Sequence, residues 1–307
     1  MPATPVDLAD KKILITGPTG QVALPVVEHY AKTADVYALA RFHKAKDRAR
    51  IESLGAKVLQ ADLADARSLD VVPEDIDYVL NFAVVKSGDF EYDLAANAEG
   101  VGNLMMRCRT AKAFLHFSST AVYEYCGQEP RVENAPLGDN HRVMFPTYSI
   151  SKIAAETVCR FVARQQKIPT TIARLSVPYG DNGGWMYFHT LMMQQGITID
   201  LHPDKPNYYN PLHSDDYIEK IPYLLGAANI EATTVNFGGS QKVSIEEWCA
   251  YITELTGFET SFKDNAKAFG SLCIDLEKMH ELIGETKVDW RDGIRRQLKN
   301  LAPELLR

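Results

Sequence analysis

The chain has 307 residues, of which 46% are hydrophobic and 24% are charged, and its formal net charge is −7. A chain of this length forms one large domain or two closely packed ones, and it buries a core without disulfides or a structural metal. The acidic balance and the lack of a basic block argue against a nucleic-acid partner. No stretch approaches the ~18 apolar residues of a membrane span, and residues 1–10 lack the basic start and apolar run of a signal peptide. We therefore expect a small-molecule partner and neither nucleic acid nor membrane.

The cysteines are few, odd in number and far apart. No C-x-x-C pair is present and no cysteine–histidine spacing is typical of a zinc site, so we expect no bound metal. Free thiols are normal in a reducing compartment, which predicts a cytoplasmic protein. The five positions are Cys108, Cys126, Cys159, Cys249 and Cys273.

The first 175 residues alternate between short apolar runs and amphipathic helical segments. Parallel strands need a long crossover between them, usually a helix. The alternation therefore predicts an α/β protein with a doubly wound parallel sheet that is covered on both faces. The predicted strands are residues 12–16, 36–40, 57–60, 77–82, 113–118 and 170–175, and the predicted helices are residues 21–32, 46–54, 93–110 and 148–166.

The pattern changes after residue 180. The segment 183–209 has no clear period and is rich in Met, Tyr, His and Pro, so it is predicted to be irregular. We predict a dinucleotide-binding sheet domain over residues 1–180, to which residues 210–240 return, and a smaller substrate-binding lobe over residues 181–307. The later predicted elements are helices at 214–225, 244–255 and 275–282 and a strand at 233–238.

A glycine-rich turn joins the first predicted strand to the first predicted helix, with the sequence T-G-P-T-G-Q-V-A at residues 16–23. Its glycines let the backbone approach a pyrophosphate closely, and the following helix offers free N–H groups and the positive end of its dipole. The spacing G-x-x-G-x-x-A differs from the common G-x-G-x-x-G, so an ordinary turn is the alternative. In the phosphate-binding interpretation, the cofactor contacts of this turn are Gly17, Thr19, Gly20, Gln21 and Val22.

The end of the second predicted strand bears on which dinucleotide binds. NAD enzymes commonly place Asp or Glu there to hold the ribose hydroxyls, but this strand is followed by Arg41, with Lys44 and Lys46 close behind. Arg41 can pair with the 2′-phosphate of NADP, and the alternative is that it is simply exposed. Asp62, after the third strand, can accept a hydrogen bond from an adenine amino group or, alternatively, cap a helix. We therefore prefer NADP over NAD as the cofactor.

Tyr148 and Lys152 are spaced i, i+4 at the start of a predicted helix, so both side chains lie on one face. A free phenol titrates near ~10, and a neighbouring ammonium lowers that pKa. Ser119 follows the fifth predicted strand, at the carboxyl edge of the sheet where ligands bind. Together the three groups can exchange a proton with a carbinol oxygen while hydride moves between its carbon and a nicotinamide. A Y-x-x-x-K pair alone is common, and its position after the glycine-rich turn and Ser119 gives it weight.

Taken in order, these motifs resemble the extended short-chain dehydrogenases/reductases, which include the NAD(P)-dependent epimerase/dehydratase group. The resemblance runs over almost the whole chain. It implies a Rossmann-type core, a bound dinucleotide, a catalytic Ser, Tyr and Lys at the positions just described, and a homodimer through the helices that contain Asn97 and Tyr148. The segments that carry it are TGPTGQVA (16–23), ADLAD (61–65), NFA (81–83), NAEG (97–100), SSTAVY (118–123), YSISK (148–152), RLSVPYG (174–180) and HSDD (213–216).

The same resemblance implies further cofactor contacts, beyond Tyr148 and Lys152 themselves. The segment N-F-A-V-V-K at residues 81–86 is similar to its counterpart in UDP-galactose 4-epimerases, where the lysine that matches Lys86 reaches the cofactor. The remaining implied contacts are Leu63, Phe82, Ala83, Asn97 and Pro178.

Four residues of the predicted substrate region depart from the family pattern or stand out in composition. Val177 stands where nucleotide-sugar members usually have Asn, and Tyr209 lies near the usual position of an Arg that grips nucleotide phosphates. An apolar Val and an uncharged Tyr cannot replace those groups. Glu124 takes a place usually held by Gly, and Trp185 opens a run rich in aromatic residues and Met. Such a run lines an apolar pocket or, in the alternative, packs the lobe's own core.

We predict an NAD(P)-dependent oxidoreductase that acts on a secondary alcohol or ketone of a small, fairly apolar molecule, with Tyr148 as the acid and base. One alternative is a redox-neutral epimerase or dehydratase that acts on a sugar or nucleotide-sugar and keeps its cofactor bound. Another is a non-catalytic nucleotide-sensing protein on the same fold, because a fold alone does not determine function.

Overall fold

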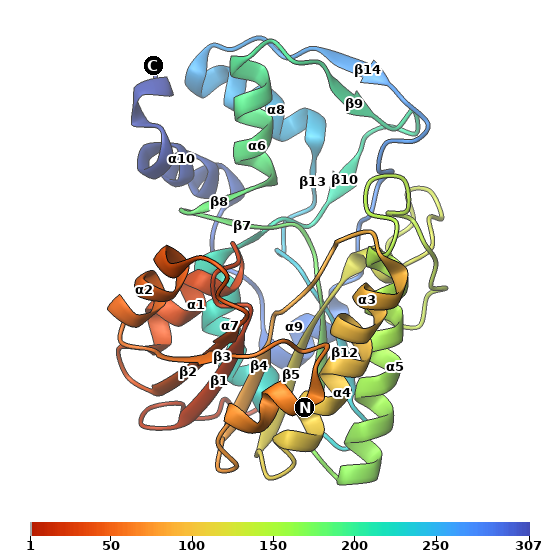
Figure 1. Ribbon diagram of the computed structural model, residues 1–307. Coiled ribbons are helices and arrows are strands. Elements are labelled where there is room, and N and C mark those ends of the chain that lie inside the picture. The colour runs from red at the N-terminus through yellow and green to blue at the C-terminus, as the bar shows by residue number, and fades with distance from the viewer. Residues whose placement is uncertain (1) are drawn as a thin grey trace.

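A parallel sheet forms the centre of the computed structural model, which describes residues 2–307 (Figure 1). Its strands are β1 (Lys12–Thr16), β2 (Asp35–Ala40), β3 (Lys57–Gln60), β4 (Tyr78–Asn81), β5 (Ala113–Ser119), β6 (Thr170–Leu175) and β12 (Thr233–Phe237). They are arranged in the order β12-β6-β5-β4-β1-β2-β3, and every pairing between neighbours is parallel. The winding therefore reverses between β1 and β4, and open α/β sheets bind ligands at the carboxyl ends of the strands at such a point.

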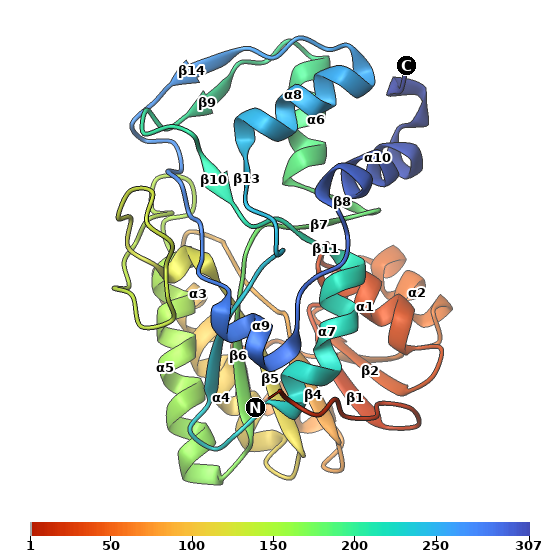
Figure 2. The same ribbon diagram turned by 180° about the vertical axis from the view of Figure 1, so that it is seen from behind.

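Helices cover both faces of this sheet (Figures 1 and 2). They are α4 (Gly100–Arg107) and α5 (Tyr148–Gln166) on one face, and α1 (Ala23–Tyr30), α2 (Ala45–Ser53), α7 (Ser214–Gly226) and α9 (Glu277–Ile283) on the other. Successive side chains of a strand point to opposite faces, so Leu14 of β1 joins the apolar layer under α4 and α5, whereas Ile13 and Ile15 join the other layer. The predicted α/β class with a doubly wound sheet is confirmed.

The predicted helix over residues 93–110 is present as an unbroken helical run over residues 90–107. Within this run, α3 (Phe90–Leu94) leads into a π-helical turn (Ala95–Glu99), which continues directly into α4. The turn contains Asn97, whose amide hydrogen-bonds the N–H and the carbonyl of Val85 at 2.7 and 2.8 Å and donates to the Ser151 hydroxyl at 3.1 Å. Single π-turns inside helices are often found at functional sites.

A smaller lobe lies beyond the carboxyl edge of the sheet (Figures 1 and 2). It contains α6 (Trp185–Gln194), α8 (Ile245–Thr256), α10 (Trp290–Leu301), β9 (Ile199–Leu201), β10 (Tyr208–Tyr209), β13 (Val243–Ser244) and β14 (Phe262–Asp264). The prediction that residues 183–209 are irregular is wrong, because α6 lies within them. The buried face of α6 includes the polar residues His189 and Thr190, which mask the apolar period. Trp248 of α8 donates a hydrogen bond to His189 Nδ1 at 2.9 Å, so this nitrogen of the buried imidazole has a partner.

The sheet and the lobe are interleaved along the chain. α7, β12 and α9 return to the sheet after the first part of the lobe, as both views show. The division of domains at residue 180 stays a prediction. Between residues 2 and 307, no helix combines the length and the apolar character needed to cross a bilayer. Short strands at the junction form a small sheet of β7 (Pro178–Gly180), β8 (Gly183–Gly184) and β11 (Leu212–His213), and single 3₁₀ turns lie at Ala66–Val71, Thr120–Val122 and Pro303–Leu305.

Candidate active site

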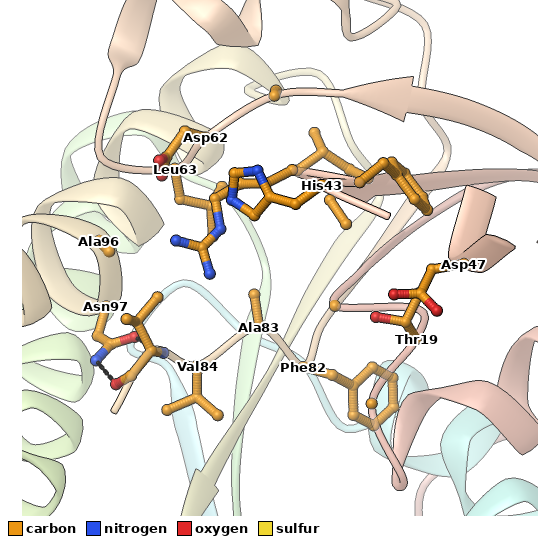
Figure 3. Close-up of a pocket in the computed structure, with 18 of the residues that line it drawn as sticks. Thr19, His43, Asp47, Asp62, Leu63, Phe82, Ala83, Val84, Ala96 and Asn97 are labelled. Carbon is orange, nitrogen blue, oxygen red and sulfur yellow. Dashed lines mark hydrogen bonds between the residues drawn. The ribbon is translucent and has the colours of Figure 1, made fainter. Parts of the chain in front are cut away.

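A cleft of about 330 Å³ lies at the carboxyl ends of β1, β2, β3 and β4 (Figure 3). Its walls come from the glycine-rich turn after β1, the segments that follow the other three strands, and the π-helical turn. Segments that lie far apart in the sequence therefore meet in one place. The residues predicted to bind the dinucleotide that line this cleft are Gly17, Thr19, Gly20, Arg41, Asp62, Leu63, Phe82, Ala83 and Asn97.

The turn after β1 has the close approach and the free donors that a phosphate needs. Gly17 has a φ of 64°, and a Cβ on it would lie 3.0 Å from the Ala83 Cα, so glycine suits this position best. α1 begins at Ala23 without a side-chain cap for its first N–H groups. The Leu24 N–H donates to the Gly20 carbonyl oxygen at 3.0 Å and Pro25 has no N–H, so the donors left for an anion within residues 2–307 are the N–H groups of Gln21, Val22 and Ala23. The helix dipole adds a favourable field. The turn therefore fits the pyrophosphate of a dinucleotide.

Six of the predicted cofactor residues lie outside this cleft, namely Gln21, Val22 and Pro178 and, nearer the end of β5, Lys86, Tyr148 and Lys152. The Gln21 amide donates to the Gly183 carbonyl oxygen at 3.3 Å, and the Val22 carbonyl oxygen accepts from the Tyr217 hydroxyl at 3.0 Å. Pro178 is half-buried in β7, at the junction with the lobe. These contacts hold the glycine-rich turn against α7 and the small sheet.

Arg41 and Asp62 are connected across the cleft through a shared partner. Arg41 Nη1 donates to the Tyr92 hydroxyl at 2.6 Å, and this hydroxyl donates to Asp62 Oδ2 at 3.0 Å. The other carboxylate oxygen of Asp62 accepts from the Ala64 N–H at 3.0 Å within a turn, whereas the 3₁₀ helix that follows is capped by Asp65, so Asp62 is not a helix cap. Arg41 is half-buried, so the alternative of a simply exposed side chain does not describe it.

The cleft also contains residues that the sequence analysis missed. Asp47 lies in the first turn of α2, and Figure 3 shows its carboxylate beside Thr19. Its position was the available signal, because the start of the helix after the second strand lies at the carboxyl edge of the sheet. A carboxylate there can hold ribose hydroxyls, whereas Arg41 and Lys44 carry positive charge that suits a phosphate. Groups of both kinds therefore share the adenosine end of the cleft.

Ser119, Tyr148 and Lys152 come together at the carboxyl end of β5. Lys152 donates from Nζ to the Phe117 carbonyl oxygen at 2.7 Å. Burial raises the pKa of the Tyr148 phenol, and a hydrogen bond with the Ser119 hydroxyl acts in the opposite direction. Lys152 is only 4% exposed, and burial lowers the pKa of its ammonium to about 8. Ser119 and Tyr148 are thus in hydrogen-bond contact, and Lys152 lies one turn further along the same helix, bonded to the end of β5.

A second lysine reaches the same phenol. Lys86 Nζ lies 5.4 Å from the centre of the Tyr148 ring and 4.6 Å from that of Phe145. Partial burial of this ammonium lowers the pKa of Lys86, and its charge contributes to the lowered pKa of Lys152. Burial still dominates at Tyr148, since its pKa stays above the ordinary value of a phenol.

A buried carboxylate holds the loop after β4 against the start of α5. Asp93 is fully buried and accepts four hydrogen bonds, from the N–H and hydroxyl of Ser87, the N–H of Gly88 and the hydroxyl of Thr147. Thr147 immediately precedes Tyr148, so this carboxylate positions the catalytic helix. Burial acts to raise the pKa of Asp93, but the hydrogen bonds outweigh it and hold this pKa below its usual range.

Aromatic rings connect the lobe to the catalytic phenol. Trp185 meets Tyr209 edge-on with ring centres 5.0 Å apart, and it lies 6.2 Å from Phe269. Phe269 stacks on His141 at 4.2 Å, and His141 lies 6.0 Å from the Tyr148 ring. The sequence analysis missed His141 and Phe269, because each lies in a loop that has neither a period nor a motif.

The other predicted substrate residues are placed differently. Tyr209 is buried, and its hydroxyl donates to the Gly270 carbonyl oxygen at 2.8 Å, so it belongs to the frame of the lobe. Glu124 is exposed. Val177 has a φ of 34°, which is unusual for a β-branched residue. Asn adopts the left-handed region more readily, so the backbone here has the shape expected for the residue that Val177 replaces.

Asp93→Asn should weaken the docking of α5, because an amide cannot accept hydrogen bonds at both of its ends. A carboxyl with a lowered folded pKa stabilises the protein above the unfolded value of ~3.9, and the contribution is lost as the pH falls through the folded pKa. We therefore expect urea unfolding to give Asp93→Asn a free energy of unfolding about 2 kcal/mol below that of wild type at neutral pH. The difference between the two proteins should narrow below about pH 4.

The matched control for this measurement is Asp89→Asn. Asp89 is exposed and accepts a single hydrogen bond, from the Tyr92 N–H at 3.1 Å. Asp89→Asn should therefore lower the free energy of unfolding much less than Asp93→Asn does. A gap for Asp93→Asn that stays constant down to strongly acidic pH would contradict this account.

Val177→Asn should stabilise the protein by about 1 kcal/mol, because Asn adopts a positive φ at lower cost than a β-branched residue. The change is measured as a rise in Tm by calorimetry. Val177→Thr keeps the branched Cβ and should bring no gain. The same Tm for all three proteins would mean that the backbone at this position is not strained.

Comparison with known proteins agrees with this geometry. The model of the NAD dependent epimerase/dehydratase family matches residues 13–237, more than half of the chain. The chain is 22% identical to the UDP-glucose epimerase YtcB of Bacillus subtilis (strain 168), itself uncharacterized, over 95% of this chain and 98% of that protein. It is also 22% identical to the human dTDP-D-glucose 4,6-dehydratase, over 94% of this chain and 89% of that protein.

Solved structures share the fold. A UDP-glucuronic acid 4-epimerase from Bacillus cereus, in complex with UDP-glucuronic acid and NAD, matches with a TM-score of 0.79 at 20% identity, over 95% of this chain and 99% of that one. DesIV, a dTDP-glucose 4,6-dehydratase from Streptomyces venezuelae with NAD bound, matches with a TM-score of 0.78 at 20% identity, over 94% and 96%. At this identity the likeness establishes the fold alone. The match to the family model goes further, and by it the chain is an enzyme of the NAD-dependent epimerase/dehydratase family, within the extended short-chain dehydrogenases/reductases.

Proposed function

We propose that this enzyme transfers hydride between a nicotinamide dinucleotide and a secondary alcohol or ketone carbon of a small, fairly apolar molecule. The observation that carries the proposal is the meeting of Ser119, Tyr148 and Lys152 at the end of β5, next to aromatic residues of the lobe. A bound nicotinamide supplies or accepts the hydride. The protein has to hold the reacting oxygen and move its proton.

In the direction of reduction, the Tyr148 phenol gives its proton to the carbonyl oxygen as that oxygen gains negative charge. The Ser119 hydroxyl is placed to hold the same oxygen. The Lys86 ammonium, 5.4 Å from the centre of the Tyr148 ring, stabilises the phenolate that remains, because opposite charge favours the ionised form. Lys152, one turn further along α5, adds its charge to the same end of the helix. In the oxidative direction, the phenolate takes the proton back.

The character of the substrate region supports an apolar substrate. Trp185 and Phe269 present aromatic surface, and Tyr209 is engaged with the lobe's backbone where a phosphate-binding group would be needed. Val177 offers no hydrogen bond from its side chain. A nucleotide-sugar substrate would need charged, bidentate contacts to its diphosphate, and neither Tyr209 nor Val177 provides one.

A second candidate is a redox-neutral epimerase or dehydratase of a sugar or nucleotide-sugar. It is favoured by the relatives, which are named as enzymes of these kinds, and by the position of Lys86 beside Tyr148. Such an enzyme returns the hydride within each turnover and retains its dinucleotide. Denaturing the purified protein and identifying the dinucleotide it releases separates the two candidates, since stoichiometric bound NAD would favour the second.

Tyr148→Phe should lower the turnover of ketones with added reduced dinucleotide by about 10²- to 10⁴-fold, because the proton donor is lost. Dinucleotide binding, measured by fluorescence titration, should be unchanged. Steady-state assays with a panel of apolar ketones check this result. Full turnover by the variant would exclude Tyr148 as the acid. A folded wild type that binds dinucleotide but turns over no alcohol, ketone or sugar would favour the non-catalytic alternative.

We propose a preference for NADP, carried by Arg41. Its guanidinium is held by Tyr92 at the adenosine end of the cleft, where a 2′-phosphate can form a charge-assisted pair. Asp47 is the group that opposes this preference. Dissociation constants for NADPH and NADH should show that Arg41→Ala loses about 10-fold or more of the NADPH preference. Asp47→Asn should shift it the other way. An unchanged ratio in Arg41→Ala would assign the preference to other groups.

We also propose a homodimer in a reducing, cytoplasmic compartment. All five cysteines are free, which is usual there. α4 and α5, the helices next to and including Asn97 and Tyr148, pack side by side on one face of the sheet. They expose Met106 at 44% and Phe161 at 59%, and exposed apolar patches often mark interfaces.

Phe161→Glu should convert the dimer to a monomer, because a charge would be buried in the interface. Light scattering coupled to gel filtration measures the mass. The matched control is Phe188→Glu on α6, since Phe188 is exposed to a similar extent, 58%, but lies on the lobe. A dimer that persists in Phe161→Glu but separates in Phe188→Glu would move the interface to the lobe.

A further inference from the structure

A second hollow, of about 230 Å³, lies between the loop before α5 and the lobe. In both views this loop reaches the end of the lobe near β10 (Figures 1 and 2). His141 and Phe269 line the hollow, and the His141 ring, stacked on Phe269, lies 6.0 Å from the ring of Tyr148. Tyr148 does not line the hollow itself, so the link between the two is the His141 ring, and it is at this ring that a small molecule held by Tyr148 would meet the hollow.

The protonation of His141 follows from its partners. The Asn140 amide nitrogen donates to the Tyr123 carbonyl oxygen at 2.7 Å, which requires the Asn140 oxygen to point the other way, toward His141 Nδ1. An amide oxygen only accepts, so Nδ1 carries the proton and donates. Nε2 is then the acceptor nitrogen. Within residues 2–307 it forms no hydrogen bond, and it is not among the atoms sealed inside the protein.

The ring stays neutral near pH 7. Burial, assisted by the charge of Lys86, lowers the pKa of His141 to about 4. The other titratable groups near it are Tyr148 and, on its own loop, Asp139 and Arg142, which pair with each other. The hollow is also lined by Tyr125, His202, Tyr209 and Lys267. A neutral imidazole of such low basicity is a poor proton acceptor in catalysis but a good hydrogen-bond acceptor. Its role is therefore recognition.

We propose that His141 is a specificity-determining residue, whose Nε2 accepts a hydrogen bond from a hydroxyl on the carbon next to the reacting carbon. The substrate class is then an α-hydroxy ketone, or the corresponding vicinal diol, on a small aromatic or apolar body. The inference rests on the proposed function, since it names the substrate class of the same site. In reduction, the carbonyl carbon gains hydride from the reduced dinucleotide and its oxygen gains the Tyr148 proton, which leaves a vicinal diol.

The aromatic surroundings strengthen this discrimination. An acceptor left unpaired in a partly buried, apolar setting loses its bond to water without compensation. A site built in this way rejects an analogue that lacks the donor more strongly than it rejects a change of one methylene. We expect a preference of about 10- to 100-fold in kcat/KM for a hydroxy ketone over the isosteric ketone with a methyl group in place of the hydroxyl.

The test uses two matched probes, 2-hydroxyacetophenone and propiophenone, with the purified full-length enzyme and NADPH. Wild type should prefer 2-hydroxyacetophenone, and His141→Phe, which keeps the stack on Phe269, should lose the preference and retain turnover of propiophenone. The matched control is His202→Phe. His202 lines the same hollow but packs at a tilt against Tyr125, with ring centres 5.0 Å apart, so this variant should keep the preference. A preference that survives in His141→Phe would overturn the inference while leaving the proposed function intact.

Binding separates this inference from the proposed function. Tyr148→Phe loaded with NADPH should turn over neither ketone, yet calorimetric titration should still show tighter binding of 2-hydroxyacetophenone than of propiophenone. The double variant that adds His141→Phe should bind both equally. If wild type reduces neither ketone, the proposed function fails for this class of compound, and equal binding of the two probes would then overturn the role of His141 as well.

A spectroscopic measurement tests the tautomer directly. Long-range ¹H–¹⁵N correlation of the histidine rings, assigned by the signal missing in His141→Phe, should show protonated Nδ1 and free Nε2 from about pH 6 to pH 8, as expected for a ring whose pKa lies well below its ordinary value. A proton on Nε2, or a charged ring in this range, would overturn the inference regardless of any turnover.

Discussion

The burial of one ammonium group determines how the catalytic helix meets the sheet. Lys152 is almost fully buried, and its Nζ is satisfied by the Phe117 carbonyl oxygen at the end of β5. One turn further along α5, the buried Glu156 pairs with Arg174 of β6 at 2.7 Å. A buried charge that loses its partner costs about 3–5 kcal/mol, so these two contacts hold α5 firmly against the adjacent strands. Because Tyr148 lies one turn before Lys152 on the same helix, these two contacts also fix its position.

Much of this arrangement was predictable, because the features that produce it are local in the sequence. Short apolar runs indicate the strands, a spacing of four places Tyr148 and Lys152 on one helix face, and the end of a strand places Ser119 at the same edge. Asp47, His141 and Phe269 were missed for the opposite reason. Their positions depend on how loops from distant parts of the chain pack together, and a loop has no period from which its neighbours can be read.

In two segments, buried polar side chains have partners that the apolar pattern does not reveal. Asn97 lies in the π-helical turn inside the predicted helix, and its amide bonds the backbone of Val85. His189 is buried on α6 and accepts a hydrogen bond from Trp248, so the buried face of this helix is partly polar and its apolar period is weak. A pattern of apolar residues therefore indicates neither the π-helical turn nor α6.

The cofactor side and the substrate side of the site are held by different kinds of contact. On the cofactor side, the glycine-rich turn presents backbone groups, which most side-chain substitutions leave in place. On the substrate side, recognition depends on individual side chains. Val177 has a positive φ but no side-chain amide, and the Tyr209 hydroxyl donates its hydrogen bond to the Gly270 carbonyl oxygen. The fold can therefore retain its dinucleotide cleft and its proton-transfer groups while its substrate changes. His141, the neutral acceptor next to Tyr148, lies on the side that is free to change.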